Sequence, residues 1–82
     1  MKVTEVRTEG NEVYEVTVQA TAQELEDLKE SAKGWNLQGQ VREVKGWFSA
    51  KYSVRLYEAP GTRSYKARIA LDAFAAQAGV VL

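Results

Sequence analysis

The chain of 82 residues contains no histidine, no cysteine and a single proline. Without cysteine it can form no disulfide, thiol nucleophile, cysteine-ligated zinc site or iron–sulfur cluster. Without histidine it lacks the commonest general base and the commonest metal ligand. A catalytic site would depend on carboxylates, lysine or tyrosine alone, in a domain with little room for a cleft. We therefore expect no enzyme, no catalytic residue, no cofactor and no metal site.

Long apolar segments are also missing. No stretch of 18 apolar residues could span a membrane. The first seven residues alternate charged and apolar side chains, without the apolar region of a signal peptide. These features predict a cytoplasmic protein with no membrane partner. The hydrophobic fraction of 45% and the charged fraction of 27% are ordinary for a globular chain, so residues 1–82 are expected to form one α+β domain.

The first half of the chain has the pattern of a β-hairpin. Residues 2–8 and 13–20 are rich in valine, threonine and tyrosine, and they flank Gly10 and Asn11, which tolerate a turn with positive φ. Strict alternation in the second strand predicts two faces. One face carries Tyr14, Val16 and Val18, and the other carries Glu15, Thr17 and Gln19.

A helix is predicted over residues 22–33. Thr21 stands three residues before Glu24, which is the spacing of a capping box, and Gly34 is a natural end. Apolar residues at helical spacing give the helix one narrow apolar stripe. They are Ala22, Leu25, Leu28 and Ala32.

The second half of the chain also has the pattern of two strands followed by a helix. Residues 37–45 and 47–57 are predicted strands with a turn or bulge at Gly46, and residues 64–78 a predicted helix, capped by Thr62 or Ser64. In the longer strand, alternation separates two sets of side chains. Phe48, Ala50, Tyr52, Val54 and Leu56 point one way, and Trp47, Ser49, Lys51, Ser53, Arg55 and Tyr57 point the other.

The order ββαββα favours a four-stranded, mainly antiparallel sheet with two helices packed on one face. A strand at residues 80–82 would instead give a ferredoxin-like βαββαβ order with an extra N-terminal strand. A third arrangement pairs 37–45, 47–57 and 61–66 as a three-stranded sheet before the last helix. Trp35 is expected to anchor the core. The other expected core residues are Leu25, Leu28, Phe48, Val54, Leu56 and Phe74.

Charge is unevenly distributed, although 11 basic and 11 acidic residues balance overall. Residues 1–33 carry four basic and eight acidic side chains, a net charge of −4. Residues 34–82 carry seven basic and three acidic ones, a net charge of +4. This split favours an oriented polar partner or self-association, unless the two halves interleave and cancel it.

The outward face of strand 47–57 is the predicted binding surface. Tryptophan, tyrosine and arginine carry much of the binding energy in protein interfaces, and aromatic residues among basic ones also suit bases and phosphates. The alternative is that these side chains merely pack on one another. The candidate residues are Trp47, Lys51, Arg55 and Tyr57, with Arg42 from the preceding strand.

The last helix has two apolar faces, and a two-layer protein can bury only one of them. The expected core face carries Ala67, Ala70, Leu71, Phe74 and Ala78. The second face carries Tyr65, Ile69, Ala73 and Ala76. This second face is expected to dock on the first helix, on a second copy as a homodimer interface, or on a partner.

These features favour a small non-catalytic binding protein. We expect a protein-interaction module that acts as an inhibitor or adaptor of a larger protein or complex, a class that includes phage-type inhibitors. The alternative is a DNA- or RNA-binding module that uses the basic and aromatic face of the 37–57 hairpin. A neutral chain with an acidic half gains little from general phosphate attraction, which favours a protein partner. A structural subunit of a complex is a third possibility.

Overall fold

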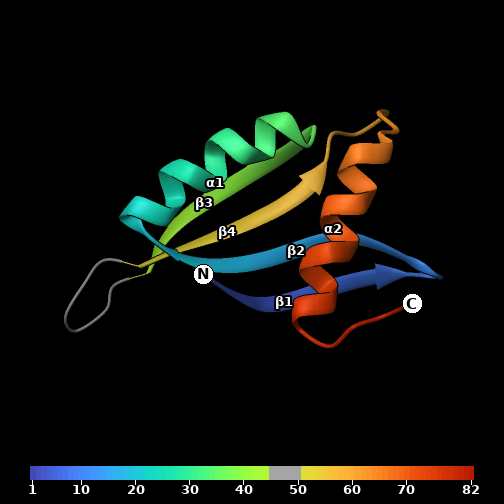
Figure 1. The fold of residues 1–82 in the computed structure, drawn as a ribbon, viewed down its shortest axis with the longest axis horizontal. Helices are drawn as coiled ribbons and strands as arrows, with labels where there is room; N and C mark the ends of the chain where they lie inside the picture. The colour runs from blue at the N-terminus through green and yellow to red at the C-terminus, as the bar shows by residue number, and fades with distance from the viewer. Residues whose placement is uncertain (45–50) are drawn as a thin grey trace.

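The computed structural model describes residues 1–44 and 51–82 (Figure 1). Its elements are β1 (Lys2–Glu9), β2 (Glu12–Thr21), α1 (Ala22–Gly34), β3 (Leu37–Val44), β4 (Lys51–Glu58) and α2 (Tyr65–Gln77). The strands form one antiparallel sheet in the order β1-β2-β4-β3. Both helices cover the same face of this sheet, as Figure 1 shows. The predicted fold class and element order are confirmed.

The two alternative topologies are wrong. Residues 80–82 form no strand, and the backbone N–H of Val80 instead donates to the carbonyl oxygen of Ala75 at 3.0 Å. In a ferredoxin-like sheet a C-terminal strand would pair with β2, but β1 occupies that position. Residues 61–64 form a turn and an irregular segment that leads into α2, so they add no strand either.

The core lies between the sheet and the two helices. From the central strands, Val16, Val18 and Leu56 are at most 1% exposed. Of the expected core residues, five are buried: Leu25, Leu28, Val54, Leu56 and Phe74. The sixth, Phe48, lies outside the described residues.

A bulge in β2 changes which side chains enter this core. Between Arg7 and Thr8 the register with β1 shifts, so that Glu15 pairs with Arg7, Val13 pairs with Thr8, and Tyr14 has no partner in β1. One extra residue reverses the alternation of faces. Val13 is therefore buried, whereas Tyr14 is 45% exposed. The prediction that Tyr14 shares the face of the buried valines is wrong.

Both helices begin at side-chain caps. The hydroxyl of Thr21 accepts the backbone N–H of Glu24 at 3.2 Å, and the Glu24 carboxylate accepts the N–H of Thr21 at 3.0 Å. This is the predicted capping box. At the start of α2, Ser64 rather than Thr62 is the cap, and its hydroxyl accepts the N–H of Ala67 at 3.3 Å.

The end of α1 is fixed to the start of α2. Asn36 has a positive φ of 58°, and its Nδ2 donates to the hydroxyl of Ser64 at 3.0 Å. The backbone N–H of Ser64 donates to the Glu58 carboxylate at the end of β4. Beside this junction the rings of Trp35 and Phe74 meet edge to face, with centroids 5.6 Å apart. Trp35 thus packs against the core, as expected.

We expect the substitution Phe74→Ala to lower the free energy of unfolding by about 3–5 kcal/mol, because it removes a buried ring and leaves a cavity. Urea melts followed by circular dichroism would measure the loss. Tyr65→Ala is the matched control, since Tyr65 lies on the same helix and is 80% exposed. A loss below about 1 kcal/mol for Phe74→Ala would contradict the core described above.

Glu24 makes the stability of the folded protein depend on pH in the acidic range. The amino group of Met1 and the backbone N–H of Thr21 lower the pKa of Glu24 to about 2 from its ordinary value of 4.5. A lowered pKa in the folded state stabilises the protein above the unfolded value, and that contribution disappears as pH falls from 4.5 towards 2. We therefore expect Glu24→Gln to flatten the pH dependence of the urea midpoint over this range. The exposed Glu30 on the same helix supplies the control, Glu30→Gln, which should keep the wild-type slope. Equal slopes for the two variants would contradict the prediction.

Candidate functional site

The face of the sheet opposite the helices is covered by no described segment. Directly paired residues of antiparallel strands share a face, so the register aligns rows of side chains across the four strands. One row runs Arg7, Glu15, Tyr57, Gln38; the next runs Glu5, Thr17, Arg55, Gln40; a third runs Lys2, Gln19, Ser53, Arg42. We call these residues, together with Lys51, the open face. It carries five cationic side chains and two carboxylates.

Glu15 is the centre of the open face. It is only 5% exposed although no helix covers it. Arg55 of β4 donates from Nη2 to Oε1 of Glu15 at 2.6 Å, and Nε of Arg7 from β1 lies 3.4 Å from Oε2. A buried carboxylate is stable only when it is paired, and here two guanidinium groups from the neighbouring strands pair with it.

The network extends to both outer strands. Nε of Arg7 also donates to Oε1 of Glu5 at 2.9 Å, and Nη1 of Arg55 donates to Oε1 of Gln40 on β3 at 3.2 Å. Hydrogen bonding to Glu5, with the charges of Glu5 and Glu15, raises the pKa of Arg7 above its ordinary value. Hydrogen bonding to Glu15 raises the pKa of Arg55 in the same way. These ion pairs and hydrogen bonds position both guanidinium groups across the sheet.

A shallow hollow lies over this network. Its volume is about 640 Å³, and side chains from all four strands line it, Arg42 among them. Arg42 makes no ion pair within the described residues, so its guanidinium is available to a ligand. The hollow presents fixed cations beside neutral hydrogen-bonding groups such as Thr17 and Ser53. It can bind a polar surface with an excess of negative charge.

The structure brings most of the predicted binding residues together. Arg42, Lys51, Arg55 and Tyr57 all lie on the open face; Lys51 and Arg55 are exposed and Tyr57 is half-buried. Trp47 lies outside the described residues. Glu5, Arg7 and Glu15 were not predicted as site residues from the sequence. The alternation of charge along β1 was the available signal, but Arg55, the second partner of Glu15, lies 40 residues away.

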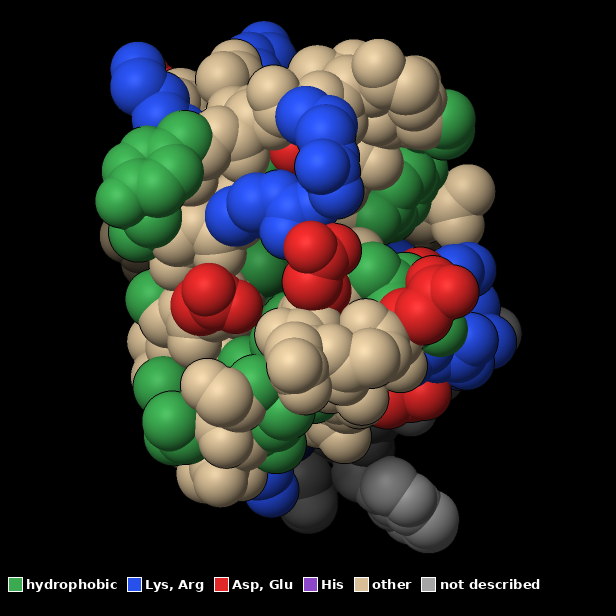
Figure 2. Space-filling model, turned by 90° about the vertical axis from the view of Figure 1, so that its right-hand side faces the viewer, with side chains coloured by type: hydrophobic (Ala, Val, Ile, Leu, Met, Phe, Trp, Pro, Cys, Tyr) green, Lys and Arg blue, Asp and Glu red, His purple; other side chains and the backbone are tan. Residues whose placement is uncertain are grey.

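The charge split of the sequence is partly cancelled in space. Glu12 of the acidic half lies 2.8 Å from Nη1 of Arg68 and 3.9 Å from Arg63, both from the basic half. Arg68 lowers the pKa of Glu12 through a hydrogen bond and its charge. Figure 2 views the end of the molecule where the β1–β2 turn and α2 lie, and it shows basic and acidic side chains intermingled there. Glu15 with Arg55 repeats this pairing of the two halves.

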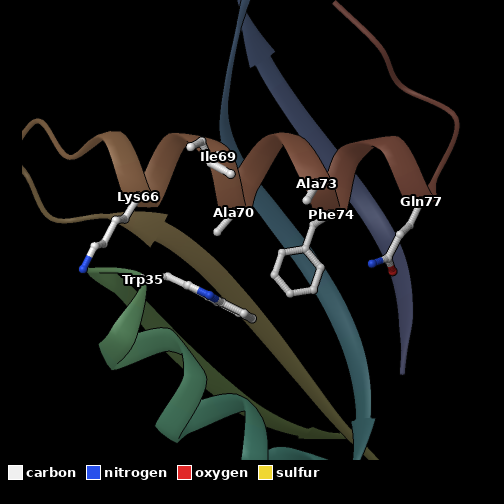
Figure 3. Close-up of a pocket in the computed structure, with 7 residues that line it drawn as sticks. All are labelled: Trp35, Lys66, Ile69, Ala70, Ala73, Phe74 and Gln77. Atoms are coloured by element: carbon white, nitrogen blue, oxygen red, sulfur yellow. The ribbon is translucent and has the colours of Figure 1, made fainter.

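The second apolar face of α2 is not covered by α1. Tyr65 is 80% and Ile69 is 52% exposed. A groove of about 330 Å³ separates this part of α2 from the end of α1, and its lining is almost entirely apolar. In Figure 3 the ring of Trp35 extends beneath α2 towards Phe74. Ala78, expected on the core face, is instead the exposed C-cap of the helix, and Ala75 is buried in its place.

Membrane-spanning helices and metal-binding clusters of carboxylates are both absent from the described residues. Neither α1 nor α2, the helices of the described ranges, has the length and hydrophobicity needed to cross a membrane. Across residues 1–44 and 51–82, no group of three or more carboxylates could hold a metal ion.

Comparison with known proteins identifies no relative: no family model matches the chain, and no curated protein or solved structure matches it significantly. The function of the protein must therefore be inferred from the geometry of its surfaces.

The homodimer predicted through the last helix is testable on the exposed α2 face. A dimer at tens of micromolar protein in sedimentation equilibrium is the expected outcome if a second copy covers Ile69, since two-fold pairing is the commonest closed assembly. Ile69→Glu should then give a folded monomer, because it places a charge in the apolar contact. Gln38→Ala, an exposed position on the open face at the opposite side of the sheet, should stay dimeric. A wild-type monomer at all accessible concentrations would exclude this interface.

Proposed function

We propose that this protein is a small non-catalytic interaction module that binds another protein through its open face, acting as an inhibitor or adaptor of a larger protein or complex. The observation that carries the proposal is the ion-pair network centred on Glu15. It fixes Arg7 and Arg55 across a sheet face that is not covered by the helices. Arginines held in place before binding lose less conformational entropy when a partner docks.

The pairing within the network favours a protein partner over a nucleic acid. A phosphate that approached Arg55 would compete with Glu15, whose oxygen already lies 2.6 Å from the guanidinium. Arg7 is likewise engaged by two carboxylates. Nucleic-acid affinity comes largely from basic groups that neutralise phosphates. A protein surface instead matches donors and acceptors together, and the open face offers both.

The charge of the open face indicates the chemistry of the partner. The open face carries five cationic side chains and only two carboxylates, so this surface is basic although the whole chain is neutral. A complementary partner surface would carry an excess of aspartate and glutamate. Arg42 and Lys51, which make no ion pair within the described residues, would supply most of this attraction.

The same excess of positive charge supports the second candidate, a DNA- or RNA-binding module. Tyr57 on the open face is half-exposed and pairs with Glu15 and Gln38, so it is placed to stack on a base. A nucleic acid would have to bind mainly through the unpaired cations. This requirement makes the two candidates separable by salt dependence.

The experiment compares two charge-matched variants. Arg42→Glu with Lys51→Glu reverses two cations of the open face without touching the buried Glu15. Arg55→Glu is unsuitable, because it would place a second carboxylate against Glu15. The control, Arg63→Glu with Lys66→Glu, reverses two exposed cations before and at the start of α2. Arg63 lies 3.9 Å from Glu12, but this exposed pair contributes little to stability. Both variants should retain the wild-type urea midpoint.

We expect immobilised wild-type protein to retain a specific protein from nuclease-treated lysate of the source cells. The open-face variant should lose this partner at least tenfold, whereas the control variant should retain it. Single-stranded and duplex oligonucleotides should bind weakly between about 50 and 200 mM salt. Tight, salt-steep oligonucleotide binding that the open-face variant abolishes would overturn the proposal and establish the second candidate.

A further inference from the structure

The two edges of the sheet differ. β1 forms one edge, and its register with β2 is interrupted twice, between Val3 and Glu5 and between Arg7 and Thr8. Bulges and charges of this kind protect an edge from further pairing. β3 forms the other edge and pairs with β4 without interruption from Leu37 to Val44. Within the described chain, no backbone group on the outer side of β3 bonds to another segment.

An apolar groove runs along the β3 edge beneath α1. Leu28 and Ala32 of α1 and Leu37 and Val41 of β3 line it, and its volume is about 270 Å³. Val41 is 43% exposed, although its side chain lies on the same face of the sheet as its buried partner Val54. An apolar side chain is therefore left partly uncovered beside a free strand edge.

Gly39 enlarges the groove. A Cβ at this position would lie 3.4 Å from Cγ1 of Val54 and 3.6 Å from Cδ2 of Leu56, which is ordinary van der Waals contact. Gly39 does not have a positive φ, so the backbone does not require a glycine there. A glycine within a strand often marks a place where another chain approaches closely. Here it leaves the side chains of Val54 and Leu56 accessible from the groove.

Two lysines give the groove its charge. Lys29 and Lys33 line it from α1, and both are exposed. Lys29 lies 3.8 Å from the exposed carboxylate of Glu26, a distance at which the pair contributes little. Lys33 makes no ion pair with any described residue. The groove thus has an apolar floor and a cationic rim.

We infer that an extended peptide segment of a partner protein adds to β3 as a fifth strand. A small apolar side chain of the segment fills the space over Gly39 beside Val41, and a carboxylate reaches Lys29 and Lys33. Backbone hydrogen bonds to the edge supply affinity, and the groove selects alternate side chains. This inference stands apart from the open face, because the groove lies on the helix side of the sheet.

The rim charge argues against a second copy as the occupant. Two copies joined through β3 would place their α1 helices side by side across the two-fold axis. Lys29 and Lys33 of one copy would then face the same lysines of the other, and like charges repel. A peptide with a carboxylate at this position meets the opposite charge.

The test uses an immobilised array of eight-residue peptides, the length of β3. Four alternate positions point to the helix side of the sheet; three of them carry alanine or valine, and the fourth carries aspartate, glutamate or lysine. The other four positions point to the open face and carry only serine or threonine. Peptides with a carboxylate should bind at least tenfold more tightly than those with lysine at the same position. Binding of the strongest peptide should shift amide resonances in β3 and α1 and leave those of β1 unchanged.

Three variants test whether the peptide binds in the groove beside β3. Gly39→Val should fold normally and reduce peptide affinity at least tenfold, because its methyl groups occupy the space over Val54 and Leu56. Lys29→Glu with Lys33→Glu should reverse the preference between glutamate and lysine peptides. The open-face variant, Arg42→Glu with Lys51→Glu, should still bind the strongest peptide through β3. This outcome keeps the test independent of the proposed function.

The inference is overturned if the array retains no peptide, if Gly39→Val binds as tightly as wild type, or if the shifted resonances lie on another surface. A concentration-dependent dimer that Gly39→Val abolishes would also overturn it in favour of a second copy.

Discussion

The organisation of the sheet depends on one buried carboxylate. Glu15 lies on the face opposite the helices, and it is stable there because Arg7 and Arg55 reach it from the strands on either side. A buried carboxylate that needs these partners also specifies the register in which β2 pairs with β4. A shift of one residue between β2 and β4 would turn Arg55 to the helix side and leave the carboxylate buried without this partner. The same contact thus stabilises the sheet and orients the arginines that form the open face.

The two sides of the sheet present different chemistry. The helix side holds nearly all of the apolar core, and two hollows on that side, one between α2 and the end of α1 and one beneath α1, are lined mainly by apolar side chains. The open face is basic and hydrogen-bonding. A domain with only two layers cannot cover both faces of its sheet, so one face is always available for contact. In this chain that face is polar, which allows it to stay in water without a partner.

The helices and strands could be predicted from local sequence patterns. The β2 bulge and the contacts of the open face depend on pairing between distant strands. The capping box at Thr21 and the valine-rich strands follow from spacing within a few residues, so they could be predicted. The bulge at Tyr14 could not, because an inserted residue is invisible until β1 and β2 are paired. Part of the binding surface was predicted from alternation in β4. The partnership of Arg55 with Glu15 spans 40 residues and required the strand order. The groove beside Gly39 required the path of α1 over β3.

The strand order also constrains how the chain assembles. β4 is the last strand in sequence, yet it lies between β2 and β3 and pairs with both. During synthesis β2 and β3 have no common neighbour until Glu58 has been made. Before then β1 and β2 are the only neighbouring strands of the final sheet that can pair. The sheet is therefore completed by inserting one strand between two others, a non-local step that is slower than closing the hairpin.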